Sequence, residues 1–158
     1  MNSLERAIST TEEIRDALAA EIEVARAERV LIRNMDIDGL FARAAKRNDF
    51  NIRTAGLQHR LAAELGEVAQ GFGMTEVTLE GLQSRAPGLG QRMSAVLAEV
   101  RALASALAEL DGLNKVLGQR ALSYVRAHLS VLSPRPSAYD RRGTSSSAPR
   151  STTTVRVA

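Results

Sequence analysis

The segment NMDIDG places side-chain oxygens at alternate positions, which is the spacing with which a calcium-binding loop begins. In such a loop Asn34, Asp36 and Asp38 would supply the first oxygen ligands, and the glycine that follows would allow the sharp turn. The twelfth position of a calcium loop must hold a bidentate glutamate, and in this sequence it holds Ala45. We therefore interpret the segment as a break between two helices, with Asp36 as the cap of the second.

Other residues with catalytic or ligand-binding potential are too scattered to form a site. Gly71 and Gly73 begin a dinucleotide-binding pattern, but its third glycine position holds Glu76. The histidines His59 and His128 have no companion at a helical spacing that would form a metal pair, and the chain has no cysteine. No nucleophile and base are recognisable as a pair. We expect no enzymatic activity, no cofactor and no metal site.

The positive charge of the chain lies at its C-terminal end. Residues 133–158 contain five arginines and the single acid Asp140, which gives +4, whereas the whole chain carries +3. Residues 1–132 therefore carry −1, and a body without net positive charge does not favour nucleic acid as a partner. Residues 133–158 are also rich in serine and threonine and poor in apolar residues, a composition typical of a flexible, disordered tail.

The first ten residues, MNSLERAIST, contain Glu5 and lack the apolar core of a signal peptide. No apolar run approaches the roughly 18 residues that a membrane span needs. We therefore expect a cytoplasmic protein that does not insert into the membrane.

The spacing of apolar residues predicts an all-α fold. Helices are expected at residues 4–33, from Asp36 to the glycines of GFGM, at 78–85, and at 89–132, with APGLG as the turn before the last. The proline-containing segment SPRP ends the last helix. The expected architecture is an elongated antiparallel helical bundle or coiled coil, in which one long C-terminal helix packs on two shorter ones. The expected domains are a helical domain at 1–132 and a flexible tail at 133–158.

Core positions are expected where apolar residues recur at intervals of three and four. In the first helix these are Ile14, Leu18, Ile22, Ala25 and Ile32, with Arg29 in the same row. In the second helix they are Leu40, Phe41, Ala44, Ala45, Ile52, Leu57, Leu61, Leu65 and Val68. In the last helix they are Met93, Leu97, Val100, Ala104, Leu107, Leu110, Asn114, Leu117, Ala121, Tyr124 and His128.

Asn114 is a polar residue within the apolar row of the last helix. Such a residue either fixes the register of a bundle or contacts a bound partner, and the sequence leaves both roles open. Further apolar residues widen this row beyond what two shorter helices would cover, which is typical of a helix-binding or bundle-completing surface. A homodimer or the bundle itself are the alternative ways to cover it. The additional residues are Val96, Leu103, Leu113, Val116, Leu122, Val125, Leu129 and Leu132.

Three stretches of the chain resemble the FlgN family of flagellar export chaperones. Glu28 and Leu31, followed by NMDIDGLFARAAKR, are similar to the family's break of small and acidic residues before a leucine and a lysine. LNKVLGQRALSYVRAHLSVL is similar to the family's asparagine followed by leucines at helical spacing. AYDRRG resembles the tyrosine and glycine ending found just after that helix in many members. Together the resemblance covers about residues 4–143.

The resemblance implies a cytoplasmic chaperone of bacterial flagellum assembly and type III protein export. Its implied partners are hook-associated proteins of the FlgK/FlgL type, bound through their C-terminal helical segments, and the cytoplasmic domain of the export-gate membrane protein. Lys115 and Gly118 stand where the family often has a second asparagine. The candidates for cargo contact are Leu110, Leu113, Asn114, Leu117, Leu122, Val125 and Leu129. The candidates for docking at the export gate are Tyr139, Asp140 and Gly143.

Two other classes of function are compatible with the same sequence. The apolar row of the last helix would also suit a homo-oligomeric coiled-coil adaptor or structural protein. The arginine-rich tail would suit a nucleic-acid binder, for which the predicted sign is a steep dependence of binding on salt.

Overall fold

The computed structural model describes residues 3–132, which form four helices and no strand. These are α1 (Ser3–Asn34), α2 (Ile37–Phe72), α3 (Leu79–Arg85) and α4 (Pro87–Leu132). The expected all-α class and the long C-terminal helix are thus confirmed. The chain divides into two compact units at Leu122, so α4 begins in the first unit and ends in the second. The expected tail lies outside the described residues, and its flexibility stays a prediction.

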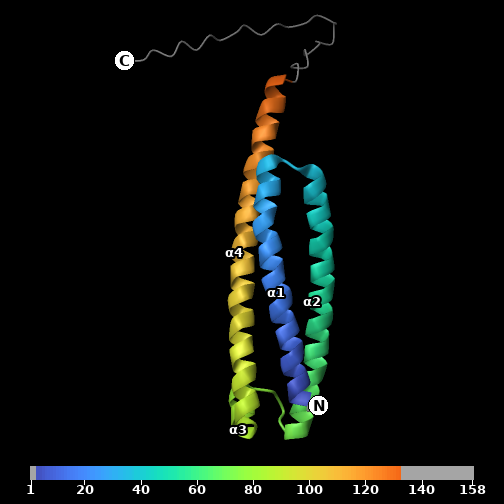
Figure 1. The fold of residues 1–158 in the computed structure, drawn as a ribbon, viewed down its shortest axis with the longest axis vertical. Helices are drawn as coiled ribbons and strands as arrows, with labels where there is room; N and C mark the ends of the chain where they lie inside the picture. The colour runs from blue at the N-terminus through green and yellow to red at the C-terminus, as the bar shows by residue number, and fades with distance from the viewer. Residues whose placement is uncertain (1–2, 133–158) are drawn as a thin grey trace, which may run out of the picture. The chain divides into compact units, whose positions relative to one another are not determined.

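Within the first unit the three long helices lie side by side, and α3 lies at the end where α2 leads into α4 (Figure 1). α1 and α2 are antiparallel because a two-residue connection joins them. α4 runs antiparallel to α2 and therefore lies beside α1 in the same direction (Figure 1). This is the antiparallel bundle that the sequence predicts.

The turn between α1 and α2 is built from NMDIDG as expected. The Asp36 side chain caps α2 by accepting a hydrogen bond from the Gly39 backbone N–H at 2.9 Å. Just before it, Met35 has a φ of 53°, and the Asp36 N–H donates to the Leu31 carbonyl at 3.0 Å. This left-handed ending of a helix usually carries glycine, so methionine is unusual here. The oxygen-rich segment therefore acts as a helix stop and a helix cap.

The next boundaries also follow the sequence, with one correction. Gly73 ends α2 in the left-handed conformation with a φ of 61°, and the Thr78 hydroxyl caps α3. The segment APGLG is not a separate turn, because α4 already begins at Pro87. Proline suits this position, since the first residue of a helix needs no N–H for an intrahelical bond.

Two clusters of apolar side chains form the core, and α1 supplies half of the first and most of the second. The first contains Leu4, Ala7, Ile8, Val68, Leu82 and Met93. The second contains Ile14, Leu18, Ile22, Ala25, Leu57 and Leu107. Because every long helix contributes to each cluster, burial of these side chains holds the bundle together.

Several expected core positions are wrong. Exposed residues among them are Ala44, Ala45, Ala104, Leu117, Tyr124 and His128, and two large apolar residues of α2 are exposed as well. Phe41 and Ile52 were expected in the core, but their side chains are 73% and 65% exposed. α2 turns the face of Arg43 and Leu57 inward instead, which leaves Phe41 and Ile52 on other faces of the helix. Val96, one of the apolar residues that widen the row of the last helix, is 5% exposed, so at this position the bundle itself covers the row.

Gly90 marks the closest approach of α3 and α4 and gives the first prediction. A Cβ atom at this position would lie 2.6 Å from the Gln83 backbone nitrogen, so the two helices would have to separate. We expect Gly90→Ala to lower the free energy of unfolding by about 1–3 kcal/mol. Gly112→Ala is the control, because a Cβ there meets no atom within 4 Å. Alanine at Gly112 is expected to stabilise α4 by about 1 kcal/mol. Urea unfolding of both variants checks this, and equal shifts would contradict the close approach.

Candidate protein-binding surface

Asn114 is buried on α4 and joins it to α1 through two hydrogen bonds. Its side chain is 4% exposed. The amide nitrogen donates to the Ala25 carbonyl at 2.8 Å, and the amide oxygen accepts from the Arg29 guanidinium at 3.2 Å. Ala25 and Arg29 are one helical turn apart, so Asn114 can form both hydrogen bonds at only one position along α1. This fixes the register of α4 against α1. This geometry supports the register role and places Asn114 away from the surface.

Beyond Asn114 no described residue of α4 is buried. Within the first unit, large apolar side chains of α4 are exposed from the residue before Asn114 onward, with Leu113 at 54%, Leu117 at 39% and Leu122 at 58%. Within the second unit Leu129 is 55% exposed and Val125 is half-buried. Leu110 differs from these, because it packs against the second core cluster. Of the expected cargo residues, five therefore have side chains at least partly free for a partner, while Leu110 and Asn114 face the bundle.

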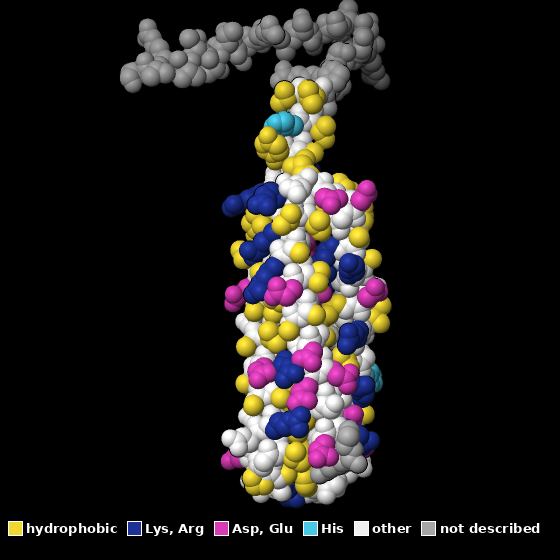
Figure 2. Space-filling model, in the orientation of Figure 1, with side chains coloured by type: hydrophobic (Ala, Val, Ile, Leu, Met, Phe, Trp, Pro, Cys, Tyr) yellow, Lys and Arg dark blue, Asp and Glu magenta, His cyan; other side chains and the backbone are white. Residues whose placement is uncertain are grey.

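α4 and the C-terminal end of α1 enclose a groove within the first unit. Its volume is about 400 Å³. Its apolar lining comes from Val30, Ile32 and Met35 on the α1 side and from Leu117 and Ala121 on α4. Two arginines of α1, Arg29 and Arg33, lie at its walls. In Figure 2, several basic side chains lie at the level of the upper end of α1, with hydrophobic side chains between them.

A buried cluster of charged side chains joins α1, α2 and α4. Arg43 donates to Glu21 and to Glu28, and the side chains of Arg43 and Glu21 are each only 6% exposed. Arg47 donates to Glu21 at 2.9 Å and to both carboxylate oxygens of Asp111, with the closer at 2.5 Å. Each buried charge therefore has an opposite partner, as the low polarity of the interior requires.

The protonation of Arg47 is secured by the same cluster. Burial lowers the pKa of its guanidinium, but the hydrogen bonds that it donates to Asp111 and Glu21 outweigh this effect, and the pKa lies above its ordinary value. The bridge from α2 to α4 thus does not depend on a titration of this arginine.

The sequence carries a sign of this cluster that its apolar pattern does not show. Glu28 and Arg43 lie equally far along the chain from the turn at Met35 and Asp36, so an antiparallel pair of helices must bring them together. That spacing was the signal that could have revealed it. The resemblance drew attention to Lys46 instead, and Lys46 is exposed.

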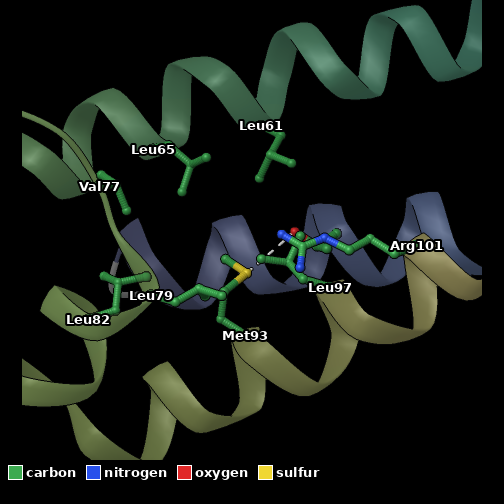
Figure 3. Close-up of a pocket in the computed structure, with 9 residues that line it drawn as sticks. Leu61, Leu65, Val77, Leu79, Leu82, Met93, Leu97 and Arg101 are labelled. Atoms are coloured by element: carbon green, nitrogen blue, oxygen red, sulfur yellow. Dashed lines mark hydrogen bonds between the residues drawn. The ribbon is translucent and has the colours of Figure 1, made fainter.

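A second cavity lies at the opposite end of the first unit, under α3. Its volume is about 310 Å³, and Figure 3 shows Leu61 and Leu65 of α2 facing Leu82 of α3 and Met93 of α4 across it. The Thr11 hydroxyl donates to the Ala7 carbonyl at 2.7 Å and lies 3.7 Å from the Met93 sulfur, the contact that Figure 3 marks with a dashed line. Because Leu82 and Met93 are 1% and 2% exposed, this cavity is a loosely packed part of the core.

No helix among residues 3–132 combines the length and the apolar character that crossing a membrane requires. Within the same range, no group of three His, Cys, Asp or Glu side chains is placed to hold a metal ion. Tyr139, Asp140 and Gly143, the expected docking residues, lie outside the described residues.

Comparison with known proteins gives one match. The model of the family described as FlgN protein matches residues 1–147, which is nearly the whole chain. No curated protein and no solved structure matches the chain. The family match confirms the resemblance that the three sequence stretches carry, and it includes the helices, the groove and the segment around Tyr139.

The buried charge cluster gives the second prediction. Arg43→Met removes two hydrogen bonds from Glu21 and Glu28 and leaves these carboxylates undercompensated, so we expect a loss of about 3 kcal/mol of stability. Arg53→Met is the control, because Arg53 is exposed on the same helix, and a change within about 0.5 kcal/mol is expected. Thermal and urea unfolding measure both. Similar stabilities for the two variants would show that the cluster does not hold the helices together.

Proposed function

The chain belongs to the FlgN family of flagellar export chaperones, and we propose that it binds hook-associated proteins in the cytoplasm and delivers them to the flagellar type III export gate. The family is one of chaperones and not of enzymes. The observation that carries the finer proposal is the series of large apolar side chains that α4 leaves exposed after Asn114. A soluble protein rarely exposes such a series unless a partner covers it.

The proposed cargo is the C-terminal helical segment of a hook-associated protein of the FlgK/FlgL type. An export cargo that is not yet assembled exposes apolar side chains on one face of such a segment. Complete burial of one leucine side chain contributes about 1.5–3 kcal/mol, so a few residues suffice for specific binding without ATP. The chaperone would keep the segment from aggregating and release it when the export gate competes for the complex.

We propose different roles for the seven residues that the sequence analysis selected. Leu113, Leu117, Leu122, Val125 and Leu129 contact the cargo directly, since their side chains are at least partly accessible. Leu110 and Asn114 support cargo binding by holding α4 in place, because both contact the bundle. Docking at the gate is assigned to Tyr139, Asp140 and Gly143, since a tyrosine supplies large contact area and a polar group at low entropic cost.

Leu122 gives the third prediction. Leu122→Asp places a charge on the proposed cargo surface, where desolvation on binding would cost several kcal/mol, so binding should weaken at least a hundredfold. The free protein should keep its stability because Leu122 is 58% exposed. Calorimetry with the C-terminal segment of each hook-associated protein of the same genome measures the affinity.

Ile52→Asp is the matched control for Leu122→Asp. Ile52 is 65% exposed on α2, so the same substitution leaves the surface of α4 unchanged, and wild-type affinity is expected. Equal binding by both variants would contradict the assignment of cargo binding to α4. A wild-type protein that forms stable homodimers and binds no hook-associated segment would favour the coiled-coil adaptor instead.

Tyr139 gives the fourth prediction, which separates gate docking from cargo binding. Tyr139→Ala should leave affinity for the cargo unchanged but weaken binding of the loaded chaperone to the cytoplasmic domain of the export gate. Secretion of the junction proteins should fall in parallel. The measurements are calorimetry with the purified gate domain and a secretion assay. Wild-type gate affinity in this variant would reduce Tyr139 to a spacer residue.

A further inference from the structure

We propose that the groove between the end of α1 and α4 receives an amphipathic helix whose apolar face is flanked by carboxylates. This groove is the one lined by Val30, Ile32, Met35, Leu117 and Ala121, with Arg29 and Arg33 at its walls. The proposal rests on the proposed function, because Leu117 belongs to both surfaces, and it specifies the chemistry of the cargo. It also extends the binding site from α4 onto α1.

The arginines of α1 differ in whether they have an acidic partner. Three of the five arginines of α1, Arg6, Arg15 and Arg26, form ion pairs with carboxylates. Arg29 donates only to the neutral amide of Asn114, and Arg33 has no hydrogen bond or ion pair among the described residues. The two arginines at the groove are thus the two of α1 that lack an acidic partner, and they are available to one on another molecule.

The two helix segments that form the groove carry only positive charge. Residues 29–35 and 112–122 contain Arg29, Arg33, Lys115 and Arg120 and no acid. The helix dipole favours a basic residue in the last turn of α1, which by itself would explain Arg33. It does not explain why the facing stretch of α4 also lacks acids, since that stretch lies within a helix and not at its end. A partner with carboxylates accounts for both segments.

The backbone at Met35 is strained. A residue other than glycine with a φ of 53° is disfavoured, and the equivalent end of α2 has Gly73 with a φ of 61°. Met35 is 41% exposed and lines the groove, so its side chain adds apolar surface where the fold alone would favour glycine. Strain of this kind persists where a side chain has a function, and methionine adapts well to different apolar partners.

The same charges argue against two other occupants. Residues 133–158 of this chain contain five arginines and one acid, so they would bring like charge to the groove. A second copy of the chain would bring the same basic segments toward each other in a symmetric contact. An acidic, amphipathic helix of another protein is therefore the occupant that the charges favour.

The test uses the full chain and two synthetic helical peptides of equal length. Both carry leucines at positions i, i+3, i+4 and i+7, and the flanking positions are all glutamate in one peptide and all lysine in the other. We expect the glutamate peptide to bind at least tenfold more tightly at low salt and to lose affinity as salt rises. Fluorescence anisotropy measures the affinities. Equal affinity for both peptides, or none for either, would overturn the proposal.

Two variants assign the effect to the groove. Arg33→Glu should weaken binding of the glutamate peptide about tenfold and strengthen binding of the lysine peptide. Arg53→Glu, an exposed arginine on α2, is the control with the same change of net charge and should bind as the wild type does. If Arg53→Glu weakens binding as much as Arg33→Glu, only net charge matters and the groove is not the site.

Met35→Gly provides a result that loss of folding cannot produce. Relief of the left-handed strain should raise the thermal midpoint by about 2–4 °C, while loss of the apolar side chain should weaken binding of the glutamate peptide severalfold. Unchanged affinity in this variant would exclude Met35 from the site. If hook-associated segments bind Arg33→Glu and Met35→Gly as tightly as the wild type, the inference is wrong and the proposed function stands. If such segments fail to bind the wild type, the proposed function is wrong, and the two peptides decide the inference alone.

Discussion

The hydrogen bond from Asn114 to the Ala25 carbonyl decides which part of α4 is buried and which part remains exposed. An apolar row alone permits a helix to slide by one turn, because leucines at either level pack almost equally well. An amide that must meet one carbonyl and one guanidinium removes that freedom, since a shifted α4 would bury the amide without partners. With the register fixed, Leu107 and Leu110 reach the core, whereas Leu117 and Leu122 remain exposed. The exposed surface of α4 is thus a consequence of a buried contact.

The charge cluster around Arg43 and Arg47 fixes the third helix against the other two. Burial of ions contributes little net stability, but it penalises any arrangement in which one partner is absent. Arg47 contacts α1 through Glu21 and α4 through Asp111, so it fixes the register of α2 against both helices. The apolar clusters supply the free energy of folding, whereas Asn114 and the charged residues select one register among several. A groove with arginines at its walls depends on that register, because a shift of one turn would separate Arg29 and Arg33 from Leu117.

Sequence patterns sufficed for the fold and for part of the surface. Asp36, Gly73 and Thr78 predict the helix ends correctly because caps act through neighbouring backbone groups, which a sequence shows directly. Phe41 and Ile52 were misplaced because an apolar residue reveals no direction when a buried arginine on the same helix determines the inward face. For Asn114 the sequence shows its place in the apolar row of the helix, but not its hydrogen-bond partners on α1. The groove could not be predicted, because it joins residues of two helices whose register depends on those partners.

The end of α4 remains helical although few of its side chains are buried, and this affects how a partner can bind. A helix without packing partners gains little to offset its first turn, which is costly to form. In α4 the packed residues before Asn114 supply that first turn, so the helix can continue at low cost. Local contacts add to this, such as the Tyr124 and His128 rings, whose centroids are 4.2 Å apart at successive turns. Docking on a helix that is already formed avoids the entropic cost of ordering that helix, so less apolar contact is needed for a given affinity.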